Sequence, residues 1–343
     1  SRNRTEYGVV FFGAAKSGCV LVNVSVLYAP LELAYVLAKA DVEALIHEDI
    51  FADKIAGLKA DLPAIKHYIQ IGPDGGDTVT FDDFIAGQPD AEPDIRLDER
   101  DPFSMTYTGG TSGMPKGVLA SHRARDVTAH TVMVEEHIDD RDVVGIVTPM
   151  FHVAALHIMF QPAILAGATA TLLSKWDPAD FIDQTERHGI SSVFMVPVQA
   201  RDLIRSDSFA AGRLKTLTNI GAGGALTPEG LIADCRQALP HCDYTDHYGQ
   251  SETGPLTILK PWEAETHRGS IGRAASGVDI RIADDDGNPV PPGTIGELIC
   301  RGPFLMDGYF ENEAETAQYF RKGDGWGWSG DLAVMDADGF ITL

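Results

Sequence analysis

The sequence is poor in cysteine, in positive charge and in long apolar runs. Its four cysteines show no Cys-x-x-Cys spacing, which argues against a disulfide framework or a zinc site and favours reduced thiols. Only 27 Lys and Arg stand against 50 Asp and Glu, a net charge of −23, so the basic stripe of a nucleic-acid surface is missing. No apolar run is long enough to span a bilayer, and no signal peptide is recognised. We therefore expect a cytoplasmic protein without a nucleic-acid partner.

The length and the composition indicate a folded chain of several parts. With 343 residues, 44% hydrophobic and 22% charged, the chain exceeds the usual size of one core, so we expect two or three subdomains. Ser1 is not a start methionine, a helix is already under way at residues 7–15, and a strand is cut at 340–343. These ends predict a fragment of a longer protein.

Helix and strand signals alternate along most of the chain. We expect helices at 7–16, 30–39, 51–59 and 121–137, with Ser121 as an N-cap, and further helices near 153–166, 178–188, 197–205 and 227–238. The strands expected between them lie at 20–24, 42–47, 65–71, 103–108, 143–148, 170–173, 192–195, 217–220 and 244–248. This alternation is typical of an α/β fold with mainly parallel sheets. From about Pro261, short strands and Gly/Pro/Asp turns predict a small antiparallel β-barrel.

The sharpest feature is a glycine-rich loop after a predicted strand, Tyr107-Thr108-Gly109-Gly110-Thr111-Ser112-Gly113-Met114-Pro115-Lys116-Gly117-Val118. Its glycines let the backbone approach a ligand closely, and successive N–H groups form a concave anion site. Three hydroxyls can donate to phosphate oxygens, and Lys116 adds a positive charge. It is not an ordinary P-loop, because glycine follows the lysine where Ser or Thr is required. A flexible linker is the alternative, but we predict a phosphate-binding loop of another class.

This loop resembles the signature of the adenylate-forming superfamily, which contains acyl- and aryl-CoA synthetases, firefly-type luciferases and nonribosomal adenylation domains. The usual pattern is Tyr-Thr-Ser-Gly-Thr-Thr-Gly-x-Pro-Lys-Gly, from which this chain departs at Gly109 and Ser112. The resemblance covers nearly the whole chain. It implies the superfamily's N-terminal domain, in which two mainly parallel sheets flanked by helices form αβαβα-type layers beside a small β-barrel. The subdomains expected are 1–140 with the phosphate loop, 141–260 with the adenine and acyl pocket, and the barrel at 261–343, without the hinge and C-terminal domain.

A second stretch, Asp246-His247-Tyr248-Gly249-Gln250-Ser251-Glu252-Thr253-Gly254, resembles the Tyr-Gly-x-Thr-Glu signature of the same superfamily. The resemblance implies that Tyr248, followed by Gly249, stacks on adenine, and that Asp246 or His247 meets the adenine amino group. Ser251 is expected to hydrogen-bond the α-phosphate. Glu252 offers a hard oxygen for the Mg²⁺ that bridges ATP phosphates.

Two further motifs complete the expected nucleotide site. Gly221-Ala222-Gly223 follows a predicted strand and resembles the segment that passes beside adenine and forms one wall of the acyl pocket. Trp328-Ser329-Gly330-Asp331-Leu332 resembles the Ser/Thr-Gly-Asp motif, so Asp331 is expected to accept hydrogen bonds from both ribose hydroxyls. For each motif, a simple tight turn is the structural alternative.

The acyl side of the site is expected around Pro149-Met150-Phe151-His152, which resembles the Pro-Leu-Phe-His stretch of CoA ligases. His152 would lie near the acyl carboxylate, although a purely structural histidine is the alternative. The expected pocket residues are His152, Val153, Val196, Gly223 and Gly249. The segments around them hold no Arg or Lys, which favours an apolar fatty or aryl acid over a dicarboxylate. No Asp stands in residues 149–157, which argues against an amino-acid substrate.

The function implied by the resemblance is that of an AMP-forming acid:CoA ligase. Its substrates would be a carboxylic acid, ATP with Mg²⁺, and coenzyme A, and its catalytic residues Lys116, Glu252 and His152. We expect this chain alone to adenylate poorly, because the superfamily's C-terminal lysine is not in it. Two alternatives remain: a ligase that passes the acyl group to a carrier protein, and a catalytically idle nucleotide-binding module. A homodimer is also left open.

Overall fold

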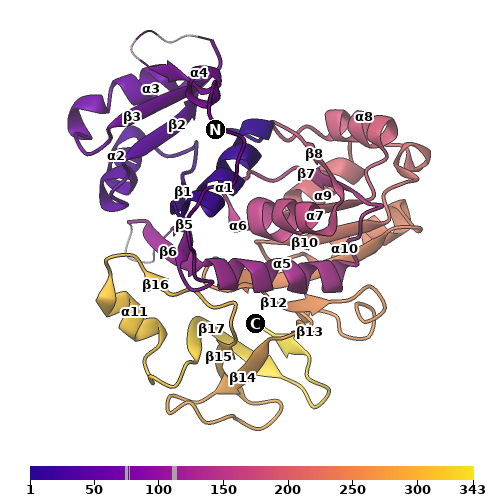
Figure 1. The fold of residues 1–343 in the computed structure, drawn as a ribbon. Helices are drawn as coiled ribbons and strands as arrows, with labels where there is room; N and C mark the ends of the chain where they lie inside the picture. Colours follow the sequence, from indigo (N-terminus) through magenta and orange to yellow (C-terminus); the bar gives the residue numbers. More distant parts are fainter. Residues whose placement is uncertain (74–75, 77, 110–113) are drawn as a thin grey trace.

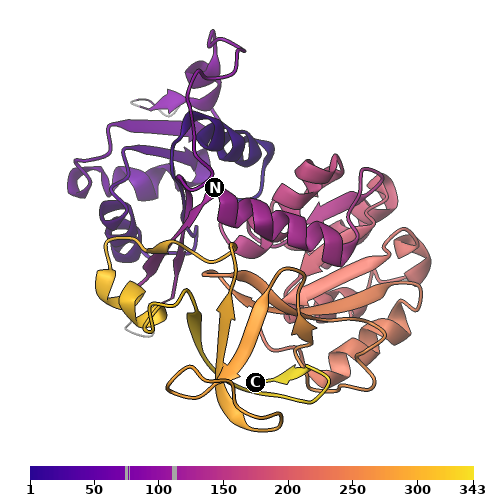
Figure 2. The ribbon, with the colours of Figure 1, turned by 60° about the horizontal axis from the view of Figure 1, so that its bottom comes forward.

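The structure is a computed structural model that describes residues 1–73, 76, 78–109 and 114–343. Within these residues the strands form four sheets, arranged as Figure 1 shows: a small sheet at one end, a large one in the body, and a curled antiparallel sheet carrying the C-terminus at the other end. Figure 2, turned by 60°, shows the curled sheet from below, with the long helix α5 above it. The predicted α/β fold with helix-flanked sheets and a small antiparallel barrel is confirmed.

The first sheet holds the predicted phosphate loop between two of its strands. Its order is β1 (Leu21–Asn23), β5 (Pro102–Thr108), β6 (Lys116–Ser121) and β16 (Gly308–Tyr309). β1 and β5 are parallel, whereas β5–β6 and β6–β16 are antiparallel. The sequence did not predict β6, whose pairing brings Thr108 opposite Lys116. α1 (Thr5–Ser17) reaches this sheet through Phe11, whose ring lies 5.0 Å from that of Phe103.

A second, three-stranded parallel sheet contains β2 (Ala44–Glu48), β3 (His67–Ile71) and β4 (Val79–Thr80). The helices of this region are α2 (Pro30–Lys39), α3 (Ala52–Ala56) and α4 (Phe81–Ile85). Pro30 opens α2 at a position where a missing N–H costs nothing, and the Glu32 side chain accepts from the Ala29 N–H at 2.8 Å. The helix predicted over 51–59 is present but shorter than expected. The chain there forms a 3₁₀ turn (Asp49–Phe51), then the short α3, which ends at Gly57, a residue that weakens helices.

The large sheet has the order β13-β12-β11-β10-β9-β7-β8. Its strands are β7 (Val143–Ile146), β8 (Thr169–Leu172), β9 (Ser192–Met195), β10 (Asn219–Gly223), β11 (Asp243–Gln250), β12 (Gly254–Leu259) and β13 (Arg273–Ala274). The pairs from β8 to β11 are parallel, and β12 and β13 add an antiparallel edge. Because successive side chains along a strand alternate, each face packs its own core.

Helices cover both faces of the large sheet. One core joins it to α8 (Pro178–His188), α9 (Pro197–Ile204), α10 (Glu229–Ala238) and a 3₁₀ turn at Ala211–Leu214. The other joins it to α5 (His122–Glu136), α6 (Val153–Ala155), a π-helical turn (Leu156–Phe160) and α7 (Gln161–Ala166). Ser121 caps α5 as predicted, because its Oγ accepts from the Ala124 N–H at 3.4 Å.

The curled antiparallel sheet consists of β14 (Asp279–Ala283), β15 (Ile295–Arg301), β17 (Gly327–Met335) and β18 (Ile341–Thr342). Its core contains Leu298, Cys300 and Ala333. α11 (Glu313–Tyr319) lies between β16 and β17, so this part of the chain returns to the first sheet before completing the barrel. All four cysteines are free thiols, three of them buried. In the described part of the chain, no helix has the length and apolar character needed to cross a membrane.

Candidate functional site

The two ends of the predicted phosphate loop meet in the β5–β6 hairpin. Thr108 ends β5 and Lys116 begins β6, and the two residues are antiparallel partners. Gly109 follows Thr108, and a Cβ added to it would lie in open space, with no neighbouring atom within 4 Å. The predicted phosphate-binding residues Gly110, Thr111, Ser112 and Gly113 lie outside the described residues. The hairpin therefore holds the lysine beside the loop's start.

Lys116 makes two interactions with the segment that carries β16 and α11. Its Nζ lies 2.6 Å from Oε2 of Glu315 and 5.3 Å from the centre of the Tyr309 ring. The lysine side chain is 14% exposed and the glutamate 41%. Contact with both an aromatic face and a carboxylate holds the ammonium group of the lysine in one orientation. The sequence singled out neither Tyr309 nor Glu315 for this site, and each lies far from Lys116 along the chain.

Glu252 contacts the same tyrosine through its hydroxyl group. The Tyr309 hydroxyl donates to Oε1 of Glu252 at 2.8 Å, while the backbone carbonyl of Glu252 accepts from the Met306 N–H. Burial, with the charge of Glu252, raises the pKa of Tyr309, so the hydroxyl stays protonated and remains a donor. Lys116 and Glu252, from two separate motifs, thus converge on one ring.

A buried arginine lies near this cluster. Arg125 of α5 is 1% exposed, and its Nε donates to Ser104 Oγ at 3.1 Å. Burial lowers the pKa of Arg125 to about 10, opposed by the negative charges of Asp307 and Glu252. The guanidinium remains a cation at neutral pH, so a buried positive charge interacts electrostatically with the Glu252 carboxylate.

The predicted adenine and ribose residues are also brought together. The Tyr248 hydroxyl donates to Oδ2 of Asp331 at 2.6 Å, and Gln250 Nε2 donates to the same oxygen at 3.0 Å. Gln250 Nε2 also donates to the carbonyl of Ser329 at 2.9 Å, tying the two motifs together. Burial and the Asp331 carboxylate raise the pKa of Tyr248. Gln250 belongs to the Asp246–Gly254 motif, but the sequence predicted no role for it.

Asp246 and His247, the two candidates for the adenine amino group, point to opposite faces of β11. Asp246 is half-buried, and its Oδ1 accepts from the Thr227 hydroxyl at 2.7 Å. Burial raises the pKa of Asp246 to about 6 despite this hydrogen bond. Ser251 and Glu252 follow β11 in a turn, where both are half-buried.

His247 belongs instead to a buried polar cluster with Glu136, the last residue of α5. His247 Nε2 lies 2.6 Å from Oε1 of Glu136, and the two side chains are 3% and 2% exposed. The hydroxyl of Thr245 and Nδ2 of Asn219 also donate to Glu136, at 3.0 and 2.5 Å. Burial alone would raise the pKa of Glu136, but the charge of His247 and the hydrogen bonds lower it to about 2. This cluster was not found from the sequence, because its members come from separate elements.

Gly221, Ala222 and Gly223 form the end of β10 itself, whereas the sequence predicted that they follow a strand ending at 220. The correction has a packing reason. A Cβ on Gly223 would lie 2.6 Å from the backbone oxygen of His247, its partner on β11. Ala222 points the other way, into the core beneath α9 and α10. The glycines thus let β10 and β11 pair without a side chain on the face that carries His247.

The predicted acyl residues lie around the carboxyl ends of these strands. His152 is exposed at the start of α6 and packs beside Phe151, with ring centres 4.6 Å apart. Val153 is buried, whereas Val196 is half-buried and lies close to Gly224, where an added Cβ would be 3.6 Å away.

Gly249 lies at a bulge of β11 where no side chain fits. A Cβ there would lie 2.0 Å from the carbonyl oxygen of Gly254. At this point the irregular register between β11 and β12 brings the two backbones together. Glycine at this position therefore has a structural reason in addition to its predicted role in the acyl pocket.

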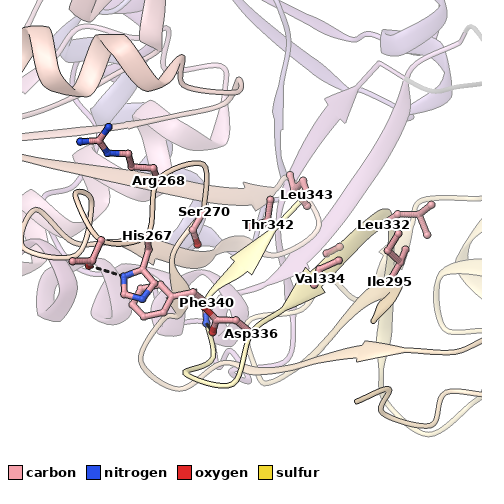
Figure 3. A pocket seen from close by; sticks show the side chains of 12 residues that line it. His267, Arg268, Ser270, Ile295, Leu332, Val334, Asp336, Phe340, Thr342 and Leu343 are labelled. Carbon is pink, nitrogen blue, oxygen red and sulfur yellow. Dashed lines mark hydrogen bonds between the residues drawn. The ribbon is translucent and has the colours of Figure 1, made fainter. Parts of the chain in front are cut away.

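A hollow in the part of the protein that the structure describes is lined by none of the predicted site residues. It measures about 650 Å³ and is bordered by His267, Arg268, Ile295, Leu332, Phe340 and Leu343 beside the C-terminal strand (Figure 3). The His267 ring stacks on Phe340, with centres 3.3 Å apart. The candidate site is therefore defined by the convergence of its side chains and not by this hollow.

Comparison with known proteins agrees with these motifs. A family model described as "AMP-binding enzyme" matches residues 1–310. The chain is 30% identical to indoleacetate–CoA ligase of Aromatoleum aromaticum and 28% identical to 4-coumarate–CoA ligase 5 of Oryza sativa, and each alignment covers 99% of this chain. It covers 66% and 64% of those two proteins, so it spans slightly less than two thirds of the curated relatives it matches.

Two solved structures share the fold. The inhibitor-bound N-terminal domain of FACL13 from Mycobacterium tuberculosis aligns with 99% of this chain over 83% of its own length, at 25% identity and a TM-score of 0.91. ATP-bound MatB from Rhodopseudomonas palustris aligns with 100% of this chain over 66% of its own length, at 25% identity and a TM-score of 0.89.

Proposed function

Because the chain belongs to the AMP-binding enzyme family, we propose that it is the nucleotide-binding part of an AMP-forming acid:CoA ligase. The observation that carries the proposal is the meeting of Lys116 and Glu252 at Tyr309. A cation and a hard carboxylate oxygen from two separate motifs then flank the place where a polyphosphate would lie. The second pair, Tyr248 and Asp331, supports an adenosine site in the same region.

The reaction proposed is adenylation followed by thioester formation. A carboxylate oxygen of the acid attacks the α-phosphorus of ATP, and pyrophosphate leaves with the electron pair of the broken P–O bond. The thiolate of coenzyme A then attacks the acyl carbon, and AMP leaves. Both partners of the first step are anions, so the protein must align them and offset their repulsion.

Each side chain has one task in this scheme. Lys116 neutralises charge that develops on the leaving pyrophosphate. Asp331 holds the ribose, and Tyr248 gives adenine an aromatic face. Asp246 accepts from the adenine amino group, since the ring of His247 is directed to Glu136. His152, exposed at the start of α6, stands at the acyl side.

The residues present fit a bound Mg²⁺. Glu252 is half-buried and supplies the hard carboxylate oxygen that this ion prefers. When bound, Mg²⁺ would neutralise phosphate charge. Tyr309 donates to one Glu252 oxygen and so fixes the direction of the carboxylate.

We propose an apolar fatty or aryl acid as the substrate. The segments around His152, Val196 and Gly223 carry no Lys or Arg that would pair with a second carboxylate. The relatives are named for indoleacetate, 4-coumarate and, in Thermus thermophilus at 29% identity, long-chain fatty acids. The subdomains proposed for this activity are 1–140, 141–260 and 261–343.

Calorimetric titration with ATP·Mg²⁺ tests the nucleotide site. Wild type should bind saturably, and a Lys116→Ala, Glu252→Ala variant should lose that binding. A matched control is Lys66→Ala, Glu43→Ala, which removes an exposed ion pair elsewhere and should bind as wild type. Pyrophosphate exchange with a panel of fatty, aryl and dicarboxylic acids then tests the chemistry. Equal binding by the site variant and wild type would refute the proposal.

A further inference from the structure

We propose that Glu315 is a built-in competitor for Lys116, so that a polyphosphate binds only by displacing this carboxylate and leaves more readily because the carboxylate returns. The inference rests on the proposed function, since it takes Lys116 to be the phosphate-binding cation. It adds a residue outside every recognised motif, on α11, that sets the affinity of the site for ATP and for pyrophosphate.

The contact itself shows the competition. Nζ of Lys116 and Oε2 of Glu315 are 2.6 Å apart, which is the separation of a strong, charge-assisted hydrogen bond. A phosphate oxygen that binds Lys116 seeks the same ammonium at the same distance. The lysine side chain is 14% exposed, so few other directions are open to an incoming anion. A hollow of about 70 Å³ adjoins it, lined also by Lys39 and Asn312.

The backbone of Glu315 is anchored independently of the lysine. Its backbone N–H donates to the side chain of Asn312, which caps α11. Lys116 is also oriented without Glu315, because its ammonium lies over the ring of Tyr309. The carboxylate is therefore not needed to aim the lysine. Its main effect on a nearby polyanion is repulsion together with occupation of the ammonium.

The neighbouring segment repeats the arrangement. Lys39, which lines the same hollow, pairs with Glu311 at 2.8 Å, just ahead of α11. Two lysines beside the phosphate loop are thus each neutralised by a glutamate of one short segment. In a chain with a net charge of −23, such local pairing keeps the site from holding anions strongly, and favours release of the pyrophosphate product.

The test is the affinity of Glu315→Gln for inorganic pyrophosphate and for ATP·Mg²⁺, measured by calorimetry. Glutamine keeps the size and removes the charge. We expect binding about 5–10-fold tighter than wild type, because a partly buried ion pair no longer has to be broken. The matched control is Glu313→Gln, which removes the same charge from the same first turn of α11 at an exposed position, and should change affinity less than twofold.

A double-mutant cycle separates competition for Lys116 from a general charge effect. If Glu315 acts through the lysine, the gain from Glu315→Gln should vanish in a Lys116→Ala background. A gain that persists there would overturn the inference. So would unchanged or weaker binding by Glu315→Gln while wild type binds ATP, an outcome that leaves the proposed function intact. No binding of either ligand by any variant, wild type included, would refute both.

Discussion

Glu136 at the end of α5 is expected to stabilise the fold through its charge. We consider Glu136→Gln, which preserves the size of the side chain. In the native cluster the carboxylate accepts from His247, Thr245 and Asn219. The amide has only one accepting oxygen, so its NH₂ group would face donors in a buried site. Such mismatches are among the costly buried substitutions.

The magnitude follows from the pKa of the carboxyl group. It falls from 4.5 to about 2 in the folded protein, because the charge and hydrogen bonds of His247 and Asn219 outweigh the effect of burial. Each tenfold change in proton affinity is worth about 1.4 kcal/mol, which gives a ceiling of about 3 kcal/mol at neutral pH. The folded pKa is depressed, so this stability is present above about pH 4.5 and is lost as pH falls toward 2.

The assay is urea unfolding of wild type and Glu136→Gln at pH 7 and at pH 3.5. We expect the variant to be less stable at pH 7 by about 2–3 kcal/mol, and the gap to narrow by about 1 kcal/mol at pH 3.5. The matched control is Glu135→Gln, the adjacent residue, whose ion pair with Lys260 is more exposed and should count for less. Equal midpoints at pH 7, or a gap that does not change with pH, would refute this account of Glu136.

Three further results are expected. Asp246→Asn should raise the melting temperature at pH 7 but not at pH 4. Burial raises the pKa of Asp246 from 3.8 to about 6, so the folded protein loses stability as pH rises through this interval, and asparagine removes that loss. A higher melting temperature at pH 4 alone would contradict this direction of the pKa shift. Gly272→Ala should lower the free energy of unfolding by roughly 3 kcal/mol or more, because the added Cβ would lie 2.1 Å from the backbone carbon of Ile258. Gly293→Ala, also at positive φ but in open space, should lower it by about 1 kcal/mol in the same melting experiment. Asp331→Ala should weaken ATP binding roughly 10–100-fold and abolish the preference for ATP over 2′,3′-dideoxy-ATP in calorimetry, and a preserved preference would show that the carboxylate does not hold the ribose.

The parts of the site that the sequence predicted are those encoded in contiguous runs. Thr108 to Lys116 and Asp246 to Glu252 each combine special residue types within a few positions, so their chemistry is visible before any folding is known. Their meeting at Tyr309 was not visible. That ring comes from a two-residue strand, β16, too short to give a periodic signal.

Long-range partners explain the remaining misses. Glu136 ends an ordinary helix, and only the register of β10 and β11 brings Asn219, Thr245 and His247 onto it. In the sequence, Glu315 cannot be distinguished from Glu313, because both are acidic residues in the first turn of the same helix. Placing Gly223 inside β10 likewise depended on its partner, since a glycine after hydrophobic residues indicates a turn as readily as a close backbone approach.

The pairing of β16 with β6 has a consequence for how the protein emerges from the ribosome. β6 is complete at Ser121, but its outer neighbour is Gly308–Tyr309, so one edge of the first sheet stays unpaired while most of the chain is still being made. At roughly 5–20 residues per second, that wait is on the order of ten seconds or more. During this time β6 offers free backbone groups to any passing strand. Lys116 lies on this edge, and a lysine on an open edge disfavours such pairing, so the charge proposed to hold phosphate in the folded protein would also protect the nascent chain from association.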